Sequence, residues 1–499
     1  MSEDLTIHSR DGSLYNEDLA PLPKSQRKWS WFEIFNVWSN DIQSLFGYTL
    51  AATLFITSGL NGWWVFLGII IAGLIVMGLV NLTGIPSVKY GIPYPVMARA
   101  SMGVRGANFP ALVRGIVAIF WYGVQTYFAS TAVSLAISAF TGGGGGGEPV
   151  LFGLTAVDWV AYILVAIFQV ALFIRGIDWI TKFLNFAGPV VYAVMIALAL
   201  YIWYAAGNSI FGQMGEIFSG STVDPGAVET AAEVSSSGLL AFIGVVGTMV
   251  AYFAAVIINY GDFARFVRSD GQMKFGNFMG LPVSLALFSF LALFITAGTA
   301  VIFGDIVTNP TQIIELVDNP FLTLIGAITF FLATVGINLV ANFIPPAYDI
   351  ANMAPSKISA RTGGFITAGI AFFIGALWVS VISAIGIAGF VDTLGAVLAP
   401  LYGILVCDFY LIRKRHLEIE ELYTAEPSGI YYFDNGWNRN ALYAFAIAAV
   451  FSVASVWVPQ LEALSGFAWI IGAALAALLH YAFMRNHAVV RDESSLAAK

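Results

Sequence analysis

Residues 63–84 read WWVFLGIIIAGLIVMGLVNLTG, an apolar stretch without a charged side chain. An α-helix needs about 20 such residues to cross a hydrocarbon core about 30 Å thick. Comparable runs recur along the whole chain of 499 residues, of which 59% are hydrophobic and 10% charged. Backbone groups in lipid must bond one another, and these runs are continuous rather than alternating, which favours helices over a barrel. The sequence therefore predicts an all-α integral membrane protein.

The apolar runs predict about twelve transmembrane helices. We expect them near 34–59, 63–84, 109–139, 153–174, 180–205, 238–260, 274–303, 320–345, 364–384, 386–412, 440–458 and 465–484. The ninth and tenth spans are the hardest to separate, because 364–412 is almost unbroken apolar sequence.

The basic residues test this map. All 22 Lys and Arg residues fall in the N-terminal segment or around the loops that follow even-numbered spans. The opposite loops at 140–152, 206–237 and 304–319 contain acidic residues and no basic one. Because positive charge stays on the cytoplasmic side, we expect a protein of the cell inner membrane with both termini cytoplasmic. No removable signal peptide is expected, since the first residues lack a basic region followed by a short apolar core.

The connecting segments carry less information. Segment 89–108 (KYGIPYPVMARASMGVRGAN) is too polar and too rich in Pro to span, so we expect a connector on the inner membrane surface. The glycine run 142–147 reads as a flexible connector to which we assign no function, and 206–237 as a long outer loop. The single cysteine, Cys407, excludes a disulfide framework and a Cys-based metal site. We expect no cofactor and no metal.

Polar side chains inside apolar spans are the functional candidates, because they are costly in a membrane. The first span contains WSNDIQSLFGY (38–48), with Asn40, Asp41 and Gln43. Asp41 either faces a central cavity from a broken helix or lies hydrated at the inner interface. The third span contains FWYGVQTYF (120–128), in which Trp121 and Gln125 share a helix face.

An indole plane beside a two-way amide suits a flat heterocycle with ring N–H and C=O groups, although Trp121 and Gln125 could also simply pack against neighbouring helices. In the sixth span, Gly244 and Gly247 could loosen the helix, and Tyr252 and Phe253 offer aromatic faces.

The eighth span carries two amides, Asn338 and Asn342, on one face, for which helix–helix contact is the ordinary explanation. Asp349 follows two prolines near the inner end of this span, where we expect it to be solvated.

Several segments carry a family likeness in order. They are KYGIPYPVMARASMGVRGANFPALVRG (89–115), FWYGVQTYF (120–128), NYGDFARF (259–266), ANFIPPAYDIANMAP (341–355) and CDFYLIRKR (407–415), followed by ELY (421–423). Together they resemble the nucleobase–cation symporter family of cytosine, uracil, allantoin and hydantoin permeases, and they look closest to bacterial allantoin- and purine-permease-like members.

The resemblance implies a leucine-transporter-type fold, with two inverted five-helix repeats and two added helices. The chain would then divide into an N-terminal segment (1–33), a first repeat (34–205), an outer loop (206–237), a second repeat (238–412), a cytoplasmic loop (413–439), two further helices (440–484) and a tail (485–499). The resemblance places substrate between the broken first and sixth spans. Trp121 would stack on it, Gln125 and Asn342 would bond its edge, and Phe253 would supply a second stacking plane.

The likeness has one departure, which concerns the coupling ion. Sodium-coupled members place two hydroxyl side chains in the eighth span, where this chain has Gly336 and Ile337. The facing positions of the first span, Asn40 and Gln43, are amides rather than small apolar residues. We therefore expect proton coupling rather than sodium coupling, with Asp41 as the first candidate for the protonated group.

The sequence thus predicts a secondary transporter for a nucleobase or related heterocycle, and not an enzyme. A sodium-coupled hydantoin or allantoin permease is the nearest alternative, and an amino-acid or amine symporter of the same fold is a more distant one. A channel would need a continuous polar stripe, and an enzyme a cluster of catalytic or metal-binding groups. Besides the heterocycle and the lipid bilayer, we expect no nucleic acid and no obligate protein partner.

Overall fold

The apolar runs form long helices in a computed structural model, which describes residues 7, 11–141, 147–219, 238–316 and 319–487. In this part of the chain, nine helices are long and apolar enough to cross a membrane. Three shorter apolar helices account for the remaining predicted spans: α2 (Leu45–Thr57), α9 (Gly238–Tyr252) and α17 (Ala360–Ala376). The described residues contain no β-strand beyond isolated bridges. The predictions for 142–147, 206–237 and the tail 485–499 lie largely outside these residues.

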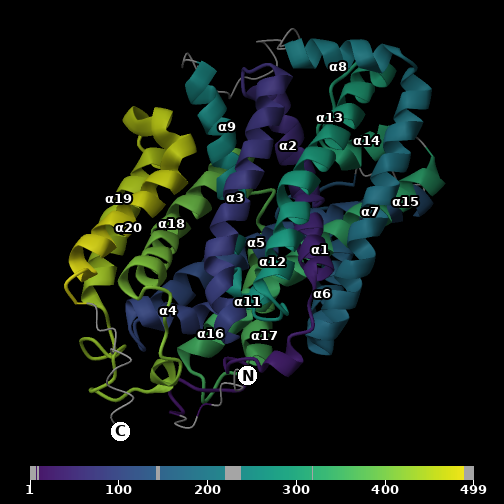
Figure 1. The fold of residues 1–499 in the computed structure, drawn as a ribbon. Coiled ribbons are helices and arrows are strands. Elements are labelled where there is room, and N and C mark those ends of the chain that lie inside the picture. The colour runs from purple at the N-terminus through teal and green to yellow at the C-terminus, as the bar shows by residue number, and fades with distance from the viewer. Residues whose placement is uncertain (1–6, 8–10, 142–146, 220–237, 317–318, 488–499) are drawn as a thin grey trace.

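Each predicted span contains at least one helix, and Figure 1 shows how the helices are arranged. In chain order they are α1 (Trp31–Ile42), α2 (Leu45–Thr57), α3 (Gly62–Tyr90), α4 (Tyr94–Met102), α5 (Asn108–Thr141), α6 (Ala156–Arg175), α7 (Ile177–Ala206), α8 (Ser209–Ser219), α9 (Gly238–Tyr252), α10 (Ala254–Asn259), α11 (Gly261–Ala264), α12 (Asp270–Phe278), α13 (Ser284–Phe303), α14 (Pro310–Leu316), α15 (Pro320–Ile337), α16 (Ile344–Met353), α17 (Ala360–Ala376), α18 (Ile387–Cys407), α19 (Arg439–Trp457) and α20 (Ala468–Met484).

The first span is two helices, as the broken-helix interpretation requires. The helix α1 ends at Ile42, and Ser44 has extended backbone at φ −60° and ψ 155°. The Ser44 hydroxyl accepts a hydrogen bond from the Gly47 N–H and so caps the new helix α2. A cap of this kind supplies a partner for a backbone donor that the interrupted helix would otherwise leave free.

The sixth span is also broken, but at another residue than the sequence suggested. Its two helices, α9 and α10, meet at Phe253, where φ is −86° and ψ is 0°. Gly247 instead lies against the backbone of Gly466, and a Cβ at Gly247 would collide with the Gly466 carbonyl oxygen. Gly247 therefore serves close packing, which is the common use of glycine in membrane helices, whereas a Cβ at Gly244 would meet no other atom within 4 Å.

The eighth span is longer than predicted. It continues from α15 through a π-helical segment, Asn338–Phe343, into α16, and so runs to Met353. Asp349 therefore lies inside this continuous helix and is 1% exposed, so the prediction that it is solvated is wrong. The reason is tertiary: α16 packs against α5, and the Asp349 side chain lies against Gly115.

Two connectors also differ from their predictions. All residues of α4 are buried, so 89–108 does not lie on the membrane surface. Arg99 of α4 donates to the Leu422 carbonyl oxygen, which belongs to the covering segment 413–438. It also donates to the Asn352 side chain of α16. The expected loop 206–237 contains the helix α8, which buries Ile210 and Phe218 among other apolar residues.

The helices are arranged around α5. This helix contacts α6, α15, α16 and α17, while α1 packs against α7, α12 and α15. The two added helices, α19 and α20, lie with α18 at one side of the bundle (Figure 1). The N-terminal end of α1, the helix α4 and the C-terminal end of α20 gather at the same end (Figure 1). We call this the inner end, because the predicted basic loops lie there.

Candidate functional site

A small cavity lies where the two broken spans meet α5 and the eighth span. Its lining residues come from α1, α5, α9, α10, α15 and the π-helical segment: Asp41, Trp121, Gln125, Tyr252, Ala255, Val256, Ile337, Ala341 and Asn342. Its volume is about 10 Å³, which is room for about one water molecule. Residues far apart in sequence are thus brought to one enclosed point.

Three of the four predicted substrate residues line this cavity. The centroid of the Trp121 ring lies 5.0 Å from that of Phe46, with an angle of 78° between the ring planes. The corresponding values for Tyr252 are 6.0 Å and 81°, so both neighbours stand edge-on to Trp121. Gln125 is buried, and its Oε1 atom has no hydrogen-bond partner. Buried polar atoms are nearly always paired, so a free acceptor beside a cavity marks a place for a donor.

Phe253 is placed differently from the other three residues. It is fully buried at the break of the sixth span and does not line the cavity. Its ring packs edge-on against Trp38 and Tyr252. The aromatic ring that the sixth span presents to the cavity is Tyr252, the other of the two aromatic residues singled out in this span.

Asp41 lies in the cavity wall and is 5% exposed, so it is not hydrated at the interface. The Tyr252 hydroxyl donates to the backbone oxygen of Asp41 at 2.9 Å and lies 3.2 Å from the Ser44 hydroxyl. These contacts join the break in the first span to the break in the sixth. Movement of either broken helix would therefore disturb both.

The remaining residues proposed for coupling hold helices together. Asn40 donates to the backbone oxygens of Asn36 and Leu184, at 2.7 and 3.3 Å. A Cβ at Gly336 would collide with the Asn40 side-chain oxygen, so glycine lets α15 approach α1 at this level. Gln43 donates to the Gly188 carbonyl oxygen of α7 at 3.4 Å. Among all the residues proposed for coupling, Asp41 and Ile337 line the cavity.

A buried polar cluster that the sequence did not reveal adjoins the cavity at Ala341. Arg114 of α5 donates to Asn259 at 2.8 Å and to the Ala341 carbonyl oxygen at 2.7 Å. Asp262 accepts from Asn259 at 3.2 Å and from the Tyr94 N–H at 2.8 Å. The cluster joins α4, α5, α10, α11 and the eighth span. Only the tertiary fold brings these residues together, although each belonged to a quoted segment.

Two more buried polar residues were missed. Asp392 of α18 is hydrogen-bonded to Thr248 of α9, and Gln169 of α6 is fully buried. The available signal was a carboxylate or an amide within an apolar run. Among the described residues, no three His, Cys, Asp or Glu side chains are grouped as metal ligands would be.

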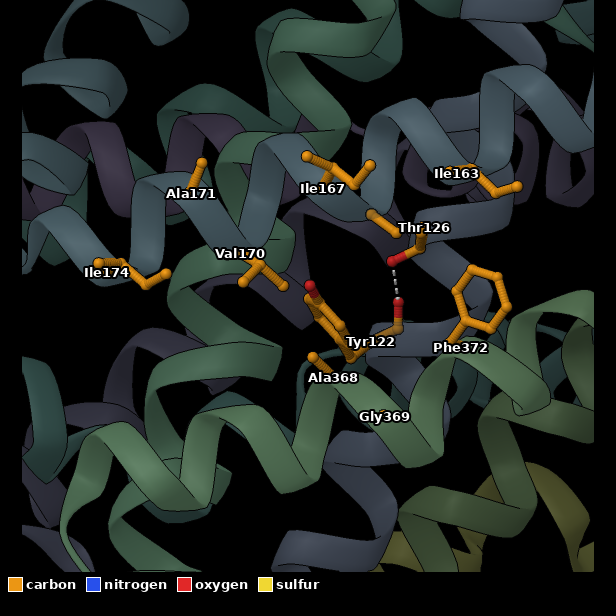
Figure 2. A pocket seen from close by; sticks show the side chains of 11 residues that line it. Tyr122, Thr126, Ile163, Ile167, Val170, Ala171, Ile174, Ala368, Gly369 and Phe372 are labelled. Carbon is orange, nitrogen blue, oxygen red and sulfur yellow. Dashed lines mark hydrogen bonds between the residues drawn. The ribbon is translucent and has the colours of Figure 1, made fainter.

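A larger cavity of about 670 Å³ lies between α5, α6 and α17 (Figure 2). Apolar side chains form most of its wall, and Ile167 is 62% exposed at its edge. Tyr122 and Thr126 supply its polar atoms. A nearly apolar surface on this membrane-facing side does not offer the converging polar groups that a polar ligand needs.

Residues 21–480 match a family model described as permease for cytosine/purines, uracil, thiamine, allantoin. The chain belongs to this permease family. Its members are transporters and not enzymes, so this chain is a multi-pass membrane permease, as the sequence predicted.

Individual relatives agree with this assignment. The chain is 34% identical over 476 residues to the allantoin permease of Bacillus subtilis, which covers 95% of this chain and 94% of the relative. It is 31% identical to the purine-uracil permease NCS1 of Arabidopsis thaliana, over 91% of this chain and 73% of the relative.

The fold has a solved counterpart. Mhp1, a nucleobase-cation-symport-1 family transporter in a closed conformation with bromovinylhydantoin bound, superposes with a TM-score of 0.79 at 23% identity. The match covers 97% of this chain and 99% of Mhp1. The predicted leucine-transporter-type fold class is therefore confirmed.

Proposed function

We propose that this permease imports a nucleobase or a related heterocycle across the inner membrane by proton-coupled alternating access. The observation that carries the proposal is the cavity, where Trp121, Gln125 and Asn342 converge beside two broken helices. The naming of its relatives as allantoin and purine-uracil permeases supports the same cargo class.

The residues of the cavity have separate roles in this proposal. The Trp121 indole stacks on the face of the heterocycle, and such stacking does not depend on which base is bound. Gln125 and Asn342 bond the edge of the ring, where amides can satisfy both N–H and C=O groups. Phe253 lies behind Tyr252 and supports the aromatic wall from the sixth span.

The size of the cavity fits a closed form of an alternating-access cycle. A volume of about 10 Å³ holds about one water, so a heterocycle can enter only after helices move apart. The breaks at Ser44 and Phe253 are the places where the first and sixth spans can bend without breaking further backbone hydrogen bonds.

The proposal of proton coupling rests on Asp41 and on the residues at the level of Gly336 and Ile337. Asp41 is a carboxylate in the cavity wall, and intramembrane carboxylates commonly carry protons in transporters. Neither Gly336 nor Ile337 carries a side-chain hydroxyl, and hard cations need oxygen ligands. The Asn40 side-chain nitrogen donates to backbone oxygens, and its side-chain oxygen lies against Gly336 without a hydrogen-bond partner.

Uptake measurements test the proposal. Labelled uracil, cytosine, hypoxanthine, allantoin and hydantoin would be supplied to cells that express the protein, with and without sodium, and with the proton gradient intact or collapsed. We expect one compound to accumulate without sodium and to stop accumulating when the proton gradient collapses.

Each other outcome has a definite meaning. Accumulation that requires sodium would favour the sodium-coupled hydantoin or allantoin permease. Uptake of an amine or amino acid in place of every heterocycle would favour the third candidate, for which the Asp41 carboxylate offers a partner for an ammonium group. Either result would contradict the proposal as stated.

A further inference from the structure

The amide of Asn338 is oriented by three acceptors, which are the Tyr122 carbonyl oxygen, the Thr126 hydroxyl oxygen and the Gln169 side-chain oxygen. Its side-chain nitrogen lies 3.0 Å from the Tyr122 carbonyl oxygen, which can only accept. The same nitrogen lies 2.7 Å from the Gln169 side-chain oxygen. Turning the Asn338 amide over would place its oxygen against both acceptors, so the nitrogen must face Tyr122 and Gln169.

Gln169 is itself oriented by a hydroxyl. The Thr126 hydroxyl donates its proton to the Tyr122 carbonyl oxygen at 2.7 Å, a bond drawn in Figure 2. The Thr126 oxygen therefore accepts from the Gln169 nitrogen at 3.0 Å. This leaves the Gln169 oxygen pointing to Asn338. Gln169 is fully buried, so no solvent competes for these bonds.

The consequence reaches the small cavity. With its nitrogen held, Asn338 turns its oxygen to Asn342, and the Asn342 nitrogen donates to it at 3.1 Å. The Asn342 oxygen is then the atom left to face the cavity as an acceptor, because the two ends of an amide point apart. Asn342 lines that cavity, whereas Asn338 and Gln169 do not.

We propose that Gln169 is a positioning residue that, through Asn338, fixes Asn342 with its carbonyl oxygen toward the substrate. The permease thereby selects heterocycles that present a ring N–H at this edge, such as lactams and imides, and rejects those methylated at that nitrogen. The inference rests on the proposed function, since it requires substrate in the small cavity.

Competition by N-methylated compounds tests this selection. The probes are the compound transported by the wild-type protein and its singly N-methylated derivatives, each competing for labelled uptake. In the wild type, methylation at one nitrogen weakens competition about tenfold or more, the effect of losing one buried hydrogen bond. Methylation at another nitrogen has a smaller effect.

The variants then separate positioning from simple structural support. Gln169→Leu removes the shortest of the bonds that hold the Asn338 nitrogen and leaves the longer ones to Tyr122 and Thr126. The penalty for the sensitive methyl group should then fall below about threefold. Gln169→Glu keeps an acceptor toward Asn338 and should restore the penalty. Ile167→Ala, on the same helix but at the membrane-facing edge, is the matched control and should keep wild-type selectivity.

The outcomes are distinguishable from failure of the proposed function. If the wild type transports a heterocycle and Gln169→Leu weakens all competitors by one common factor, Gln169 is only structural and the inference is overturned. The inference also fails if no methylated derivative is penalised in the wild type. If the wild type transports no heterocycle at all, the proposed function fails first, before any variant is compared.

Discussion

The stacking role proposed for Trp121 depends on the orientation of its indole ring. Its ring has edge-on aromatic neighbours on α2 and α9, which fix its plane. We expect Trp121→Ala to raise the KM for uptake about 10- to 100-fold, because base–aromatic stacking contributes about 1–3 kcal/mol. Trp121→Phe should retain most of the affinity.

The control is another tryptophan. Trp203 of α7 is 42% exposed on the outside of the bundle, so Trp203→Ala should leave KM unchanged. Concentration-dependent uptake of the labelled cargo, corrected for the amount of protein in the membrane, gives both values. An unchanged KM in Trp121→Ala would exclude Trp121 as the stacking partner.

Asp41 carries the coupling prediction at the same scale. The variant Asp41→Asn cannot exchange a proton, so we expect it to bind substrate and to exchange internal for external substrate without accumulating it against a gradient. Asp178→Asn, at the exposed start of α7, should accumulate normally. Accumulation by Asp41→Asn that still collapses with the proton gradient would remove Asp41 from the coupling mechanism.

At the scale of elements, the break in the first span depends on one hydroxyl. Ser44 caps α2, and its loss should lower the unfolding free energy by about 0.5–2 kcal/mol. Ser359 caps α17 through Thr362 in the same way but lies far from the cavity. We expect Ser44→Ala and Ser359→Ala to lower the melting temperature in detergent similarly, and only Ser44→Ala to change the KM.

Asp262 links the elements of the inner end in a pH-dependent way. Burial raises the pKa of this carboxyl to about 6, against the lowering effects of the Tyr94 N–H and the Arg114 and Arg265 guanidinium groups. Asp349 lies close enough to interact with it. Since the folded-state pKa is above the ordinary value, the folded protein binds more protons between pH 4 and 6.

The free energy of unfolding of the protein should therefore decrease as the pH rises from about 4 to about 6, by up to about 3 kcal/mol in total. Asp262→Asn removes the titrating group, so this part of the pH dependence should disappear. Melting temperatures measured from pH 4 to 7.5 for both proteins provide the comparison. Parallel curves for the two would show that Asp262 does not titrate there.

The sequence predicted the helical elements better than their contacts. Continuous apolar runs fix helices in a membrane, and α18 begins directly after Gly386 as expected. The helix α17 ends at Ala376, earlier than the predicted end of the ninth span at 384. The break at Phe253 lacks a glycine or proline signal. The burial of Asp349 and α4 depends on the packing of α5 and of segment 413–438, which no local pattern encodes.

The candidate site divides in the same way. Trp121, Gln125 and Asn342 could be found because polar and aromatic groups in apolar spans are unusual, and the structure brings them together. The sequence did not indicate a role for Gln169, because it is a single amide whose partners come from α5 and the eighth span. Its part in the site follows only from three-dimensional neighbours.

At the scale of the whole molecule, the distribution of charge sets the orientation in the membrane. Basic residues gather around the loops of the inner end, and the opposite loops carry none. The positive-inside rule therefore predicts that Lys357 faces the cytoplasm and Glu148 the outside. Both side chains are exposed, so a probe can reach either one.

Cysteine labelling checks this orientation with little disturbance, because the sequence has one cysteine, Cys407, and it is buried. On a Cys407→Ala background, Glu148→Cys should react with a membrane-impermeant maleimide in intact cells. Lys357→Cys should react only after the membrane is opened. The reverse pattern would invert the molecule and place the Arg114–Asp262 cluster on the outer side of the cavity. The end that we call inner would then face the outside of the cell.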